Sequence, residues 1–230
     1  IATTPVLGTT NVWANYAIVS NDERKRMACA PRDILIEQVQ TAPRQTFNPS
    51  SNPTPQYDIR FSHAIKVLFF AVRNTTWYAE WSNYTCASPQ PAVGPAINFN
   101  PSGATDPILQ TSLVYENTSR LGQMGSDYFS LVNPYYHAPV IPIDTGYHMY
   151  SYSMDFICLD PMGSTNYGKL TNVSLNPEAT SDALLGSQAT SVGTNGGPAG
   201  SGLSYTQTYE FVVTCVNNNI IRVSGGALGF

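Results

Sequence analysis

Histidine is the residue of this chain best suited to metal binding or proton transfer, and the histidines are few and scattered. The three are His63, His137 and His148, and no H-x-x-x-H or H-E-x-x-H pattern occurs. A zinc site would therefore need ligands gathered from distant parts of the chain. We interpret each histidine as a structural side chain, and His148 as a core or rim residue among tyrosines. The sequence predicts no metal site.

Cysteine could supply disulfides, metal ligands or a nucleophile. The four cysteines are widely spaced, with no C-x-x-C pair, at Cys29, Cys86, Cys158 and Cys215. An even number permits two disulfides in a secreted protein. However, no signal peptide is visible, and Cys158 and Cys215 fall in apolar, strand-like runs. We therefore expect free, buried thiols in a reducing compartment.

Other catalytic chemistries lack a supporting motif. Ser164 lies in a Gly-Ser-Thr turn rather than in the G-x-S-x-G elbow of hydrolases. The acidic residues lie mostly beside turns and caps, without a signal for the paired carboxylates of glycoside hydrolysis. The glycine-rich run at 193–202 matches neither phosphate-binding pattern, so we interpret it as a flexible loop. The sequence predicts no catalytic, cofactor-binding or metal-binding residue, no cofactor and no enzyme.

Glycan attachment is a further chemistry that the sequence permits. Four N-x-S/T sequons occur, at Asn74, Asn83, Asn117 and Asn172. In a secreted protein they would suggest N-linked glycans. With free cysteines and no signal peptide we expect them to be unused, because Asn-rich loops between strands produce sequons by chance.

Composition points to contact surfaces. Charged residues make up 11% of the chain, against about 25% in an average protein, and there are 14 tyrosines. Abundant aromatics with few Lys and Glu are typical of permanent interfaces, although a tyrosine-rich sandwich that works alone is the alternative. The only basic cluster, Arg24–Arg26 with Arg32 nearby, follows Asp22 and Glu23 and indicates a short solvated helix. We expect no direct nucleic-acid binding, and no apolar run is long enough to predict a membrane span.

The elements expected along the chain are mostly strands. Ser20-Asn-Asp-Glu23 is a capping box that predicts a short helix, limited by Pro31. For 33–40 and 64–73 a helix is conceivable, and we favour strands because β-branched and aromatic residues are enriched. Strands are expected at 12–19, 33–40, 57–61, 64–73, 77–84, 113–117, 146–158, 170–175, 205–217 and 220–224. Loops are expected at 43–56, 87–107 and 176–203, and irregular or short-helical structure at 122–136.

About nine strands with long polar connections and no internal repeat indicate an all-β fold, a sandwich or jelly roll with elaborated loops. Such long loops are usually functional, and we interpret them as contact surfaces. Along 146–158 the even positions form the more apolar face. The chain begins at Ile1 and ends in an apolar run at 225–230, so we expect it to be part of a longer polypeptide.

Four segments resemble the major capsid protein of nucleocytoplasmic large DNA viruses, most closely that of iridoviruses. They lie in order along the chain, at 12–27 with 34–40, at 59–74, at 147–153 with 159–174, and at 218–230. The resemblance implies two consecutive jelly rolls in one chain, of which the first half is missing here. It implies that residues 1–30 are the last strand of the first jelly roll with a linker helix, and that residues 31–230 are the C-terminal jelly-roll domain.

The same resemblance implies a structural role. Such subunits form homotrimeric capsomers of pseudo-hexagonal outline, which tile an icosahedral shell. The implied partners are copies of the chain, neighbouring capsomers, minor capsid proteins and, indirectly, the inner membrane of the virion beneath the shell. The implied location is the virion, with assembly in the host cytoplasm. The family has no catalytic residues to transfer.

Two other functions make different demands on the sequence. A carbohydrate-binding module would use an exposed aromatic row, for which the Tyr147–Tyr152 run is the candidate platform. A cupin-type enzyme would need a His-rich metal motif, which three scattered histidines do not provide. If the capsid interpretation is right, Trp13 and Tyr16 should be exposed in this chain alone, and the chain should aggregate.

Overall fold

The computed structural model describes residues 8–76, 82–86, 105–188, 207–225 and 227–229. Two compact units are present. The smaller is Ile1–Ile34 with Ile220–Phe230, and the larger is Leu35–Asn219. Strands β1 and β10 contribute residues to both units.

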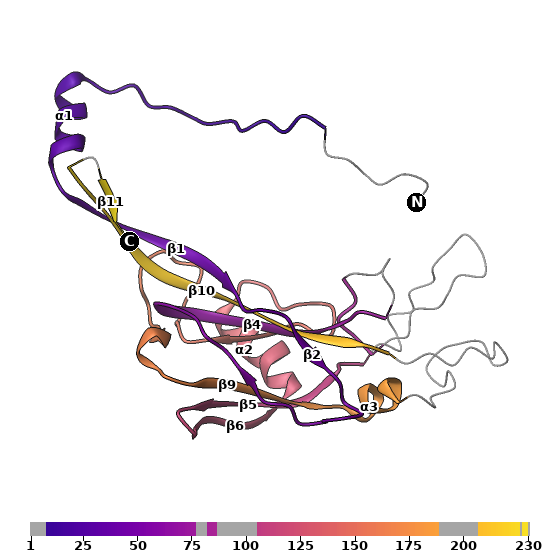
Figure 1. Cartoon of the computed structure of the whole chain (residues 1–230). Coiled ribbons are helices and arrows are strands. Elements are labelled where there is room, and N and C mark those ends of the chain that lie inside the picture. Colours follow the sequence, from indigo (N-terminus) through magenta and orange to yellow (C-terminus); the bar gives the residue numbers. More distant parts are fainter. Residues whose placement is uncertain (1–7, 77–81, 87–104, 189–206, 226, 230) are drawn as a thin grey trace. The chain divides into compact units, whose positions relative to one another are not determined.

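The larger unit is built on two β-sheets that lie as two layers (Figure 1). The first sheet has the order β1-β10-β4-β7, with β2 and β11 also paired to β10 and β8 paired to β4; the second has the order β3-β9-β5-β6. The first sheet consists of β1 (Arg32–Thr41), β2 (Gln45–Phe47), β4 (Ala64–Asn74), β7 (His148–Ser151), β8 (Thr165–Asn166), β10 (Tyr209–Ser224) and β11 (Ala227–Gly229). Of these strands, β11, the start of β1 and the end of β10 belong to the smaller unit. The second consists of β3 (Tyr57–Asp58), β5 (Ile108–Tyr115), β6 (Thr118–Gly125) and β9 (Val173–Ala179). The predicted jelly-roll sandwich is confirmed.

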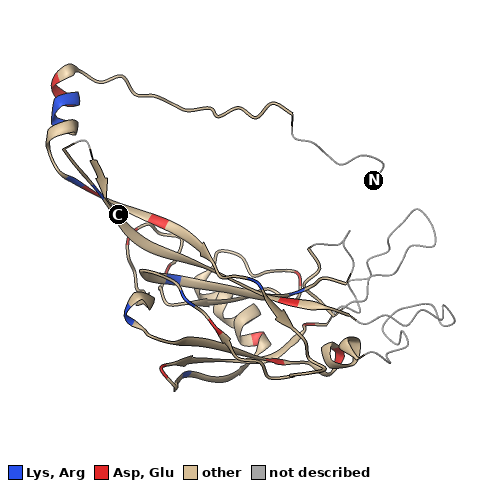
Figure 2. Cartoon of the chain, in the orientation of Figure 1, with Lys and Arg blue, Asp and Glu red and all other residues tan. Residues whose placement is uncertain are grey.

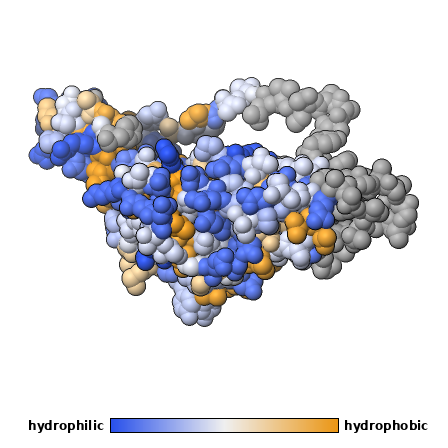
Figure 3. All heavy atoms as spheres, turned by 60° about the horizontal axis from the view of Figure 1, so that its bottom comes forward, coloured by the Kyte–Doolittle hydropathy of each residue, from blue (hydrophilic) through white to orange (hydrophobic). Residues whose placement is uncertain are grey.

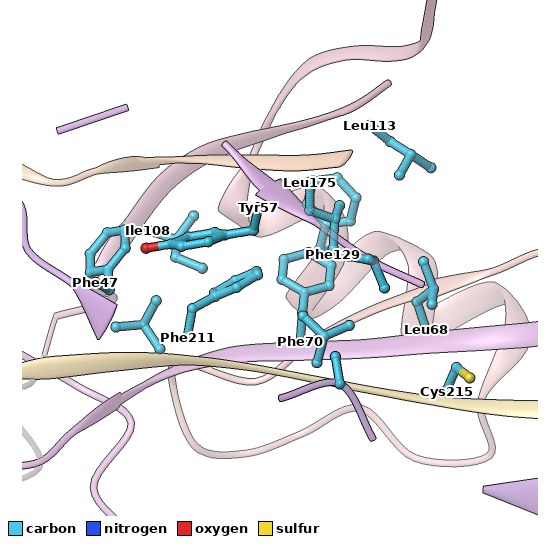
Figure 4. Close-up of a cluster of buried hydrophobic side chains, with 14 of the residues drawn as sticks. Phe47, Tyr57, Leu68, Phe70, Ile108, Leu113, Phe129, Leu175, Phe211 and Cys215 are labelled. Carbon is cyan, nitrogen blue, oxygen red and sulfur yellow. The ribbon is translucent and has the colours of Figure 1, made fainter. Parts of the chain in front are cut away.

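The core lies between the two sheets and is rich in aromatic rings (Figure 4). Strand β10 alternates buried and half-buried residues from Tyr209 to Asn217, as a strand with one core face should. The Phe211 ring stacks on Tyr57 of the other sheet at 4.6 Å between centroids. Phe70 of β4 packs edge-on against Phe129 at 5.3 Å. Ring-to-ring packing across the layers therefore ties the sheets together.

Strand β4 is buried on both faces, as its continuous apolar run predicted. Its outer face is covered by the segment after β7, where Phe156 packs on Phe69 at 5.9 Å. Lys66 interrupts the run. Pairing with β10 passes from Val67 to Ile65 without including Lys66, which marks a β-bulge at this residue.

Four short helical elements lie between strands in the described part of the larger unit. They comprise the paired turns η2 (Tyr128–Val132) and α2 (Asn133–His137), the single turn η3 (Tyr167–Lys169), and α3 (Ser181–Ser187). The first pair lies in the region expected to be irregular or short-helical. Helix α3 corrects the expected 176–203 loop: Thr180 caps it by accepting from the Ala183 amide at 3.4 Å. Strand β9 also enters this expected loop, while residues 189–203 lie outside the described residues.

The smaller unit contains helix α1 (Asn21–Cys29), and the Ser20 half of the predicted capping box is confirmed, whereas the Glu23 carboxylate pairs with Arg26 and Arg32. The Ser20 hydroxyl accepts from the Glu23 amide at 3.4 Å. The strand predicted at 12–19 does not form in this chain, where residues 8–20 carry no regular structure and are exposed. A strand needs hydrogen bonds from a neighbour, and no pairing between described residues includes this segment. The expected exposure of Trp13 and Tyr16 is confirmed, at 92% and 89%.

The predicted strand at 146–158 is mostly wrong, because β7 ends at Ser151. Beyond it, side chains bond to nearby backbone in place of a neighbouring strand. The Ser151 hydroxyl donates to the Ser153 carbonyl at 2.7 Å, and Asp155 Oδ1 accepts from the Ile157 amide at 3.0 Å. The predicted apolar face is wrong here too: Met154 is 77% exposed, whereas Ser153 is buried.

Several other boundaries differ from the predictions. The two strands expected at 205–217 and 220–224 are one, β10, because no turn forms at Asn218 and Asn219. Strand β6 occupies the start of the region expected to be irregular, and β2 lies inside the expected 43–56 loop. The strands expected at 57–61, 113–117 and 170–175 exist as β3, β5 and β9 with shifted bounds. Residues 77–81 and 87–104, part of a predicted strand and loop, lie outside the described residues.

Candidate functional site

A serine, a histidine and an aspartate do meet in the larger unit, although their positions gave no sequence signal. His148 Nε2 lies 2.7 Å from Asp106 Oδ2 and 2.9 Å from Ser126 Oγ, and its ring stacks on Phe70. Ser126 Oγ also donates to Asp106 Oδ2. In a catalytic triad the serine and the acid bond to different ring nitrogens. Here both use Nε2, and the buried Nδ1 has no partner among the described residues, so the geometry differs from that of a triad. The cluster is a buried structural link.

The remaining histidines and the cysteines do not gather into a site. His63 is exposed, and His137 Nδ1 donates to the Met154 carbonyl at 3.2 Å. Among the described residues no group of three or more His, Cys, Asp or Glu could hold a metal ion.

The four cysteines are free, and their burial varies. The expectation of buried thiols is right for Cys86 and Cys215, wrong for exposed Cys29, and only partly met by half-buried Cys158. Burial raises the pKa of the Cys86 and Cys215 thiols to about 12. These two thiols therefore stay protonated near neutral pH and are poor nucleophiles.

Two of the four sequons are structural turns. Asn74 and Asn83 are buried, and each Oδ1 accepts from the backbone amide and hydroxyl of the threonine two residues on, Thr76 and Thr85. The N-x-T pattern is explained at both positions by this Asx turn. Asn117 and Asn172 are exposed instead.

The Tyr147–Tyr152 run does not form an exposed aromatic platform. Met149 is buried, and Tyr147 packs against Tyr84 at 5.0 Å. Tyr152 joins a chain of phenol groups, in which its hydroxyl bonds to that of Tyr115 on β5 and, at 2.7 Å, to that of Tyr167 in η3. These hydrogen-bonded tyrosine hydroxyls link the second sheet to the segment after β7. The candidate carbohydrate platform is therefore absent from this run.

Burial raises the pKa of Tyr152 and Tyr167 far above the ordinary value near 10. When the pKa of a tyrosine is higher in the folded than in the unfolded protein, its contribution to stability is fully present below the pKa of the unfolded state. The contribution is lost as the pH rises from that value toward the pKa of the folded state. We expect the free energy of unfolding to fall above about pH 10. Denaturant unfolding between about pH 8 and pH 11 checks this, and Tyr152→Phe should reduce the alkaline slope. Tyr136→Phe, at an exposed tyrosine, is the control; equal slopes for both variants would contradict the assignment.

Exposed apolar residues are concentrated in one segment. The larger unit has fifteen exposed large hydrophobic residues among its described residues, and eleven lie between residues 131 and 162; the others are Leu35, Val39, Leu109 and Leu185. On the face shown in Figure 3, hydrophobic residues gather in orange groups between hydrophilic ones. Concentrations of this kind mark interaction surfaces.

Charged residues are sparse across the strands, and α1 carries both signs (Figure 2). No Lys or Arg occurs between Arg120 and Lys169, so the apolar segment lacks cations. No helix among the described residues is long and apolar enough to span a membrane. The arrangement offers apolar contact surface rather than a reactive centre.

Comparison with known proteins agrees with this arrangement. The model of the family described as large eukaryotic DNA virus major capsid protein matches residues 23–229. Proteins named major capsid protein from Costelytra zealandica iridescent virus and Invertebrate iridescent virus 6 are 64% and 63% identical over the whole chain, which spans 48% of each. The one from Frog virus 3 is 45% identical over 96% of the chain and 46% of its own length. The chain thus spans about half the length of these relatives and corresponds to their C-terminal half.

Solved structures share the fold. The capsid protein of the virus PBCV-1, a double jelly roll, aligns with a TM-score of 0.65 at 19% identity, over 92% of this chain and 54% of that chain. The Faustovirus major capsid protein aligns with a TM-score of 0.55 at 12% identity, over 88% of this chain and 36% of that chain. Because the family model covers most of the sequence and the layered fold agrees, the chain belongs to the major capsid protein family of large eukaryotic DNA viruses.

Proposed function

We propose that the protein is a structural subunit of a virion capsid, which trimerises into pseudo-hexagonal capsomers that tile an icosahedral shell. The observation that carries this is the family match over residues 23–229. The rigid sandwich and the concentration of exposed apolar residues at 131–162 support it, because a shell subunit must present fixed surfaces to its neighbours.

We further propose that the subunit acts without catalysis. The Ser–His–Asp cluster found among the described residues lacks the geometry of a proton relay, and the buried thiols of Cys86 and Cys215 are protonated near neutral pH. Function then rests on shape and contact. The proposed partners are copies of the chain, neighbouring capsomers and minor capsid proteins, with the inner membrane lying indirectly beneath the shell and no direct contact to nucleic acid. Assembly in the host cytoplasm belongs to the same proposal.

The domain assignment stays a proposal as well. In it, residues 1–30 are the last strand of an upstream jelly roll with a linker helix, and residues 31–230 are the C-terminal jelly roll. The side chains of Val12, Trp13, Tyr16 and Ile18 are exposed, which supports this assignment. A neighbouring strand would cover such apolar side chains and would also pair the backbone groups of the segment. When the full-length protein supplies that neighbour, segment 12–19 should pair as a strand.

The test is the assembly state of the full-length protein, measured by multi-angle light scattering with negative-stain imaging. Trimers of pseudo-hexagonal outline are the expected result. A protein that remains monomeric at high concentration would overturn the proposal. The 1–230 chain alone is the control, and we expect it to aggregate through its exposed N-terminal segment.

A further inference from the structure

Six exposed apolar residues form what we call the α2 shoulder: Leu131, Val132, Tyr135, Tyr136, Met154 and Met162. The first four lie on the continuous helical segment made by η2 and α2. Leu131 and Tyr135 are four residues apart, as are Val132 and Tyr136, so each pair shares a side of the helix. All six are between 44% and 77% exposed. The chain therefore places large side chains in water where a soluble helix would carry polar ones.

Defined hydrogen bonds hold the two methionines beside this helix. His137, the last residue of α2, donates from Nδ1 to the Met154 carbonyl at 3.2 Å, and the Met154 amide donates to the Met162 carbonyl at 3.2 Å. Asn133 Oδ1 accepts from the Ser151 amide at 3.1 Å, which fixes α2 to the end of β7. The shoulder is a built surface rather than a loose loop.

The turn after Met162 depends on glycine. Gly163 has φ +126°, and a Cβ there would lie 2.7 Å from the Tyr152 carbonyl oxygen. Only glycine allows both this backbone conformation and this close approach. The chain therefore returns tightly against Tyr152, and Met162 is held near Met154.

The exposed charges on the segment that carries the two methionines have one sign. Asp155 and Asp160 are exposed on the same segment, and neither takes part in an ion pair recorded between described residues. No cation occurs between residues 121 and 168. Aromatic and methionine side chains without lysine are the composition of an interface centre, and methionine adapts to a partner's shape.

We propose that the α2 shoulder is the seam against a second copy of the protein within the capsomer. This inference rests on the proposed function. Each copy also carries the complementary charge: Arg24 and Lys25 of α1 are exposed, with no ion pair recorded between described residues, and no residue of α1 is buried. A contact that joins the acidic, apolar shoulder of one copy to Arg24 and Lys25 of the next is heterologous. Repeated around an axis, such contacts close into a ring such as a trimer.

The first experiment uses the full-length protein with Tyr135→Ser and Met154→Ser combined. Because both side chains would leave a desolvated contact, we expect trimer dissociation to shift to at least about tenfold higher protein concentration in sedimentation velocity. The matched control combines Leu109→Ser and Leu185→Ser, which are 51% and 50% exposed and lie outside the shoulder. The control should leave trimer dissociation unchanged, and circular dichroism should show that both variants fold.

A charge exchange tests the identity of the partner. Asp155→Lys combined with Asp160→Lys should weaken the trimer, and adding Arg24→Glu and Lys25→Glu should restore it, because every seam would then pair reversed charges. Failure of this rescue would overturn the assignment of α1 as the opposing surface.

The outcomes separate the inference from the function on which it rests. If the unaltered protein forms no trimer, the proposed function fails. If the unaltered protein forms trimers and the shoulder variant forms them equally well, the seam assignment alone is overturned. Trimers that persist while the variant subunit unfolds more easily would likewise overturn it, since the shoulder would then pack against another part of its own polypeptide.

Discussion

Replacing Phe70 with alanine is expected to lower the free energy of unfolding by about 3–5 kcal/mol. The Phe70 side chain is buried at the centre of β4. Its ring packs on His148 at 5.2 Å, on Phe129 at 5.3 Å and on Phe211 at 6.3 Å between centroids. Those contacts join β4 to β7, to η2 and to β10, so the cavity would open where four elements meet, and rigid neighbours could close it only in part.

Denaturant unfolding of the variant and the unaltered protein measures this effect. Phe156→Ala is the matched control, because Phe156 is a partly exposed phenylalanine that covers the outer face of β4 through Phe69. It should cost markedly less, since solvent can fill the space it leaves. A Phe70→Ala cost no larger than that of the control would show that the ring cluster is not the centre of the core.

Local patterns predicted the elements that carry their own signal. Strand β4 was recognised because a run of apolar β-branched and aromatic residues suits a strand buried on both faces. Helix α1 was recognised because Ser20 and Glu23 have the spacing of a cap and Pro31 follows. In both cases neighbours along the chain decide the conformation, so no knowledge of distant contacts was needed.

Elements were mispredicted where the conformation depends on a paired strand or on side chains that bond to the backbone. Segment 12–19 has strand composition but lacks a paired neighbour, and the alternation after Ser151 is overridden by serine and aspartate side chains that bond to the backbone. Helix α3 was missed because the small and polar residues around Thr180 resemble a loop, although Thr180 is a helix cap.

The candidate seam was partly visible in the sequence. The lack of Lys and Arg between Arg120 and Lys169 can be read directly from the chain, and it marks the region that holds most exposed large hydrophobic residues in the described part of the larger unit. Which side chains face water could not be predicted, because residues 122–136 gave no clear periodicity. The cluster of Asp106, Ser126 and His148 was also invisible, because only the packing of the sheets brings these residues together.

The second large effect is expected at the buried ammonium group of Lys66. Its side chain is fully buried, and Nζ donates to Glu37 Oε1 and, at 2.6 Å, to the Cys158 carbonyl. Glu37→Ala removes the only carboxylate that meets this charge among the recorded ion pairs between described residues. Removing one partner of a buried pair costs about 3–5 kcal/mol, because the remaining charge is left in a medium that solvates it poorly.

Replacing the lysine instead of the glutamate should lower the free energy of unfolding by less, although it removes the same ion pair. Lys66→Met retains most of the side-chain volume and leaves no buried charge, while the Glu37 carboxylate, whose side chain is 32% exposed, can turn to water. The remaining cost is the unpaired Cys158 carbonyl, about 1–3 kcal/mol. Glu37→Ala should therefore destabilise the fold more than Lys66→Met.

The double variant decides between this account and simple loss of contacts. If the uncompensated ammonium group causes the damage, adding Lys66→Met to Glu37→Ala should restore part of the lost stability, and the double-mutant cycle should be strongly non-additive. If the cycle is additive, or if Lys66→Met costs more than Glu37→Ala, the aliphatic stem of Lys66 rather than its charge is what the fold requires. Denaturant unfolding of the four proteins gives the cycle, with Glu37→Gln as the isosteric control.

Because Lys66 also holds the Cys158 carbonyl, a loosened segment beyond β7 would additionally weaken the α2 shoulder at Met154 and Met162, so the same variants should lower trimer stability.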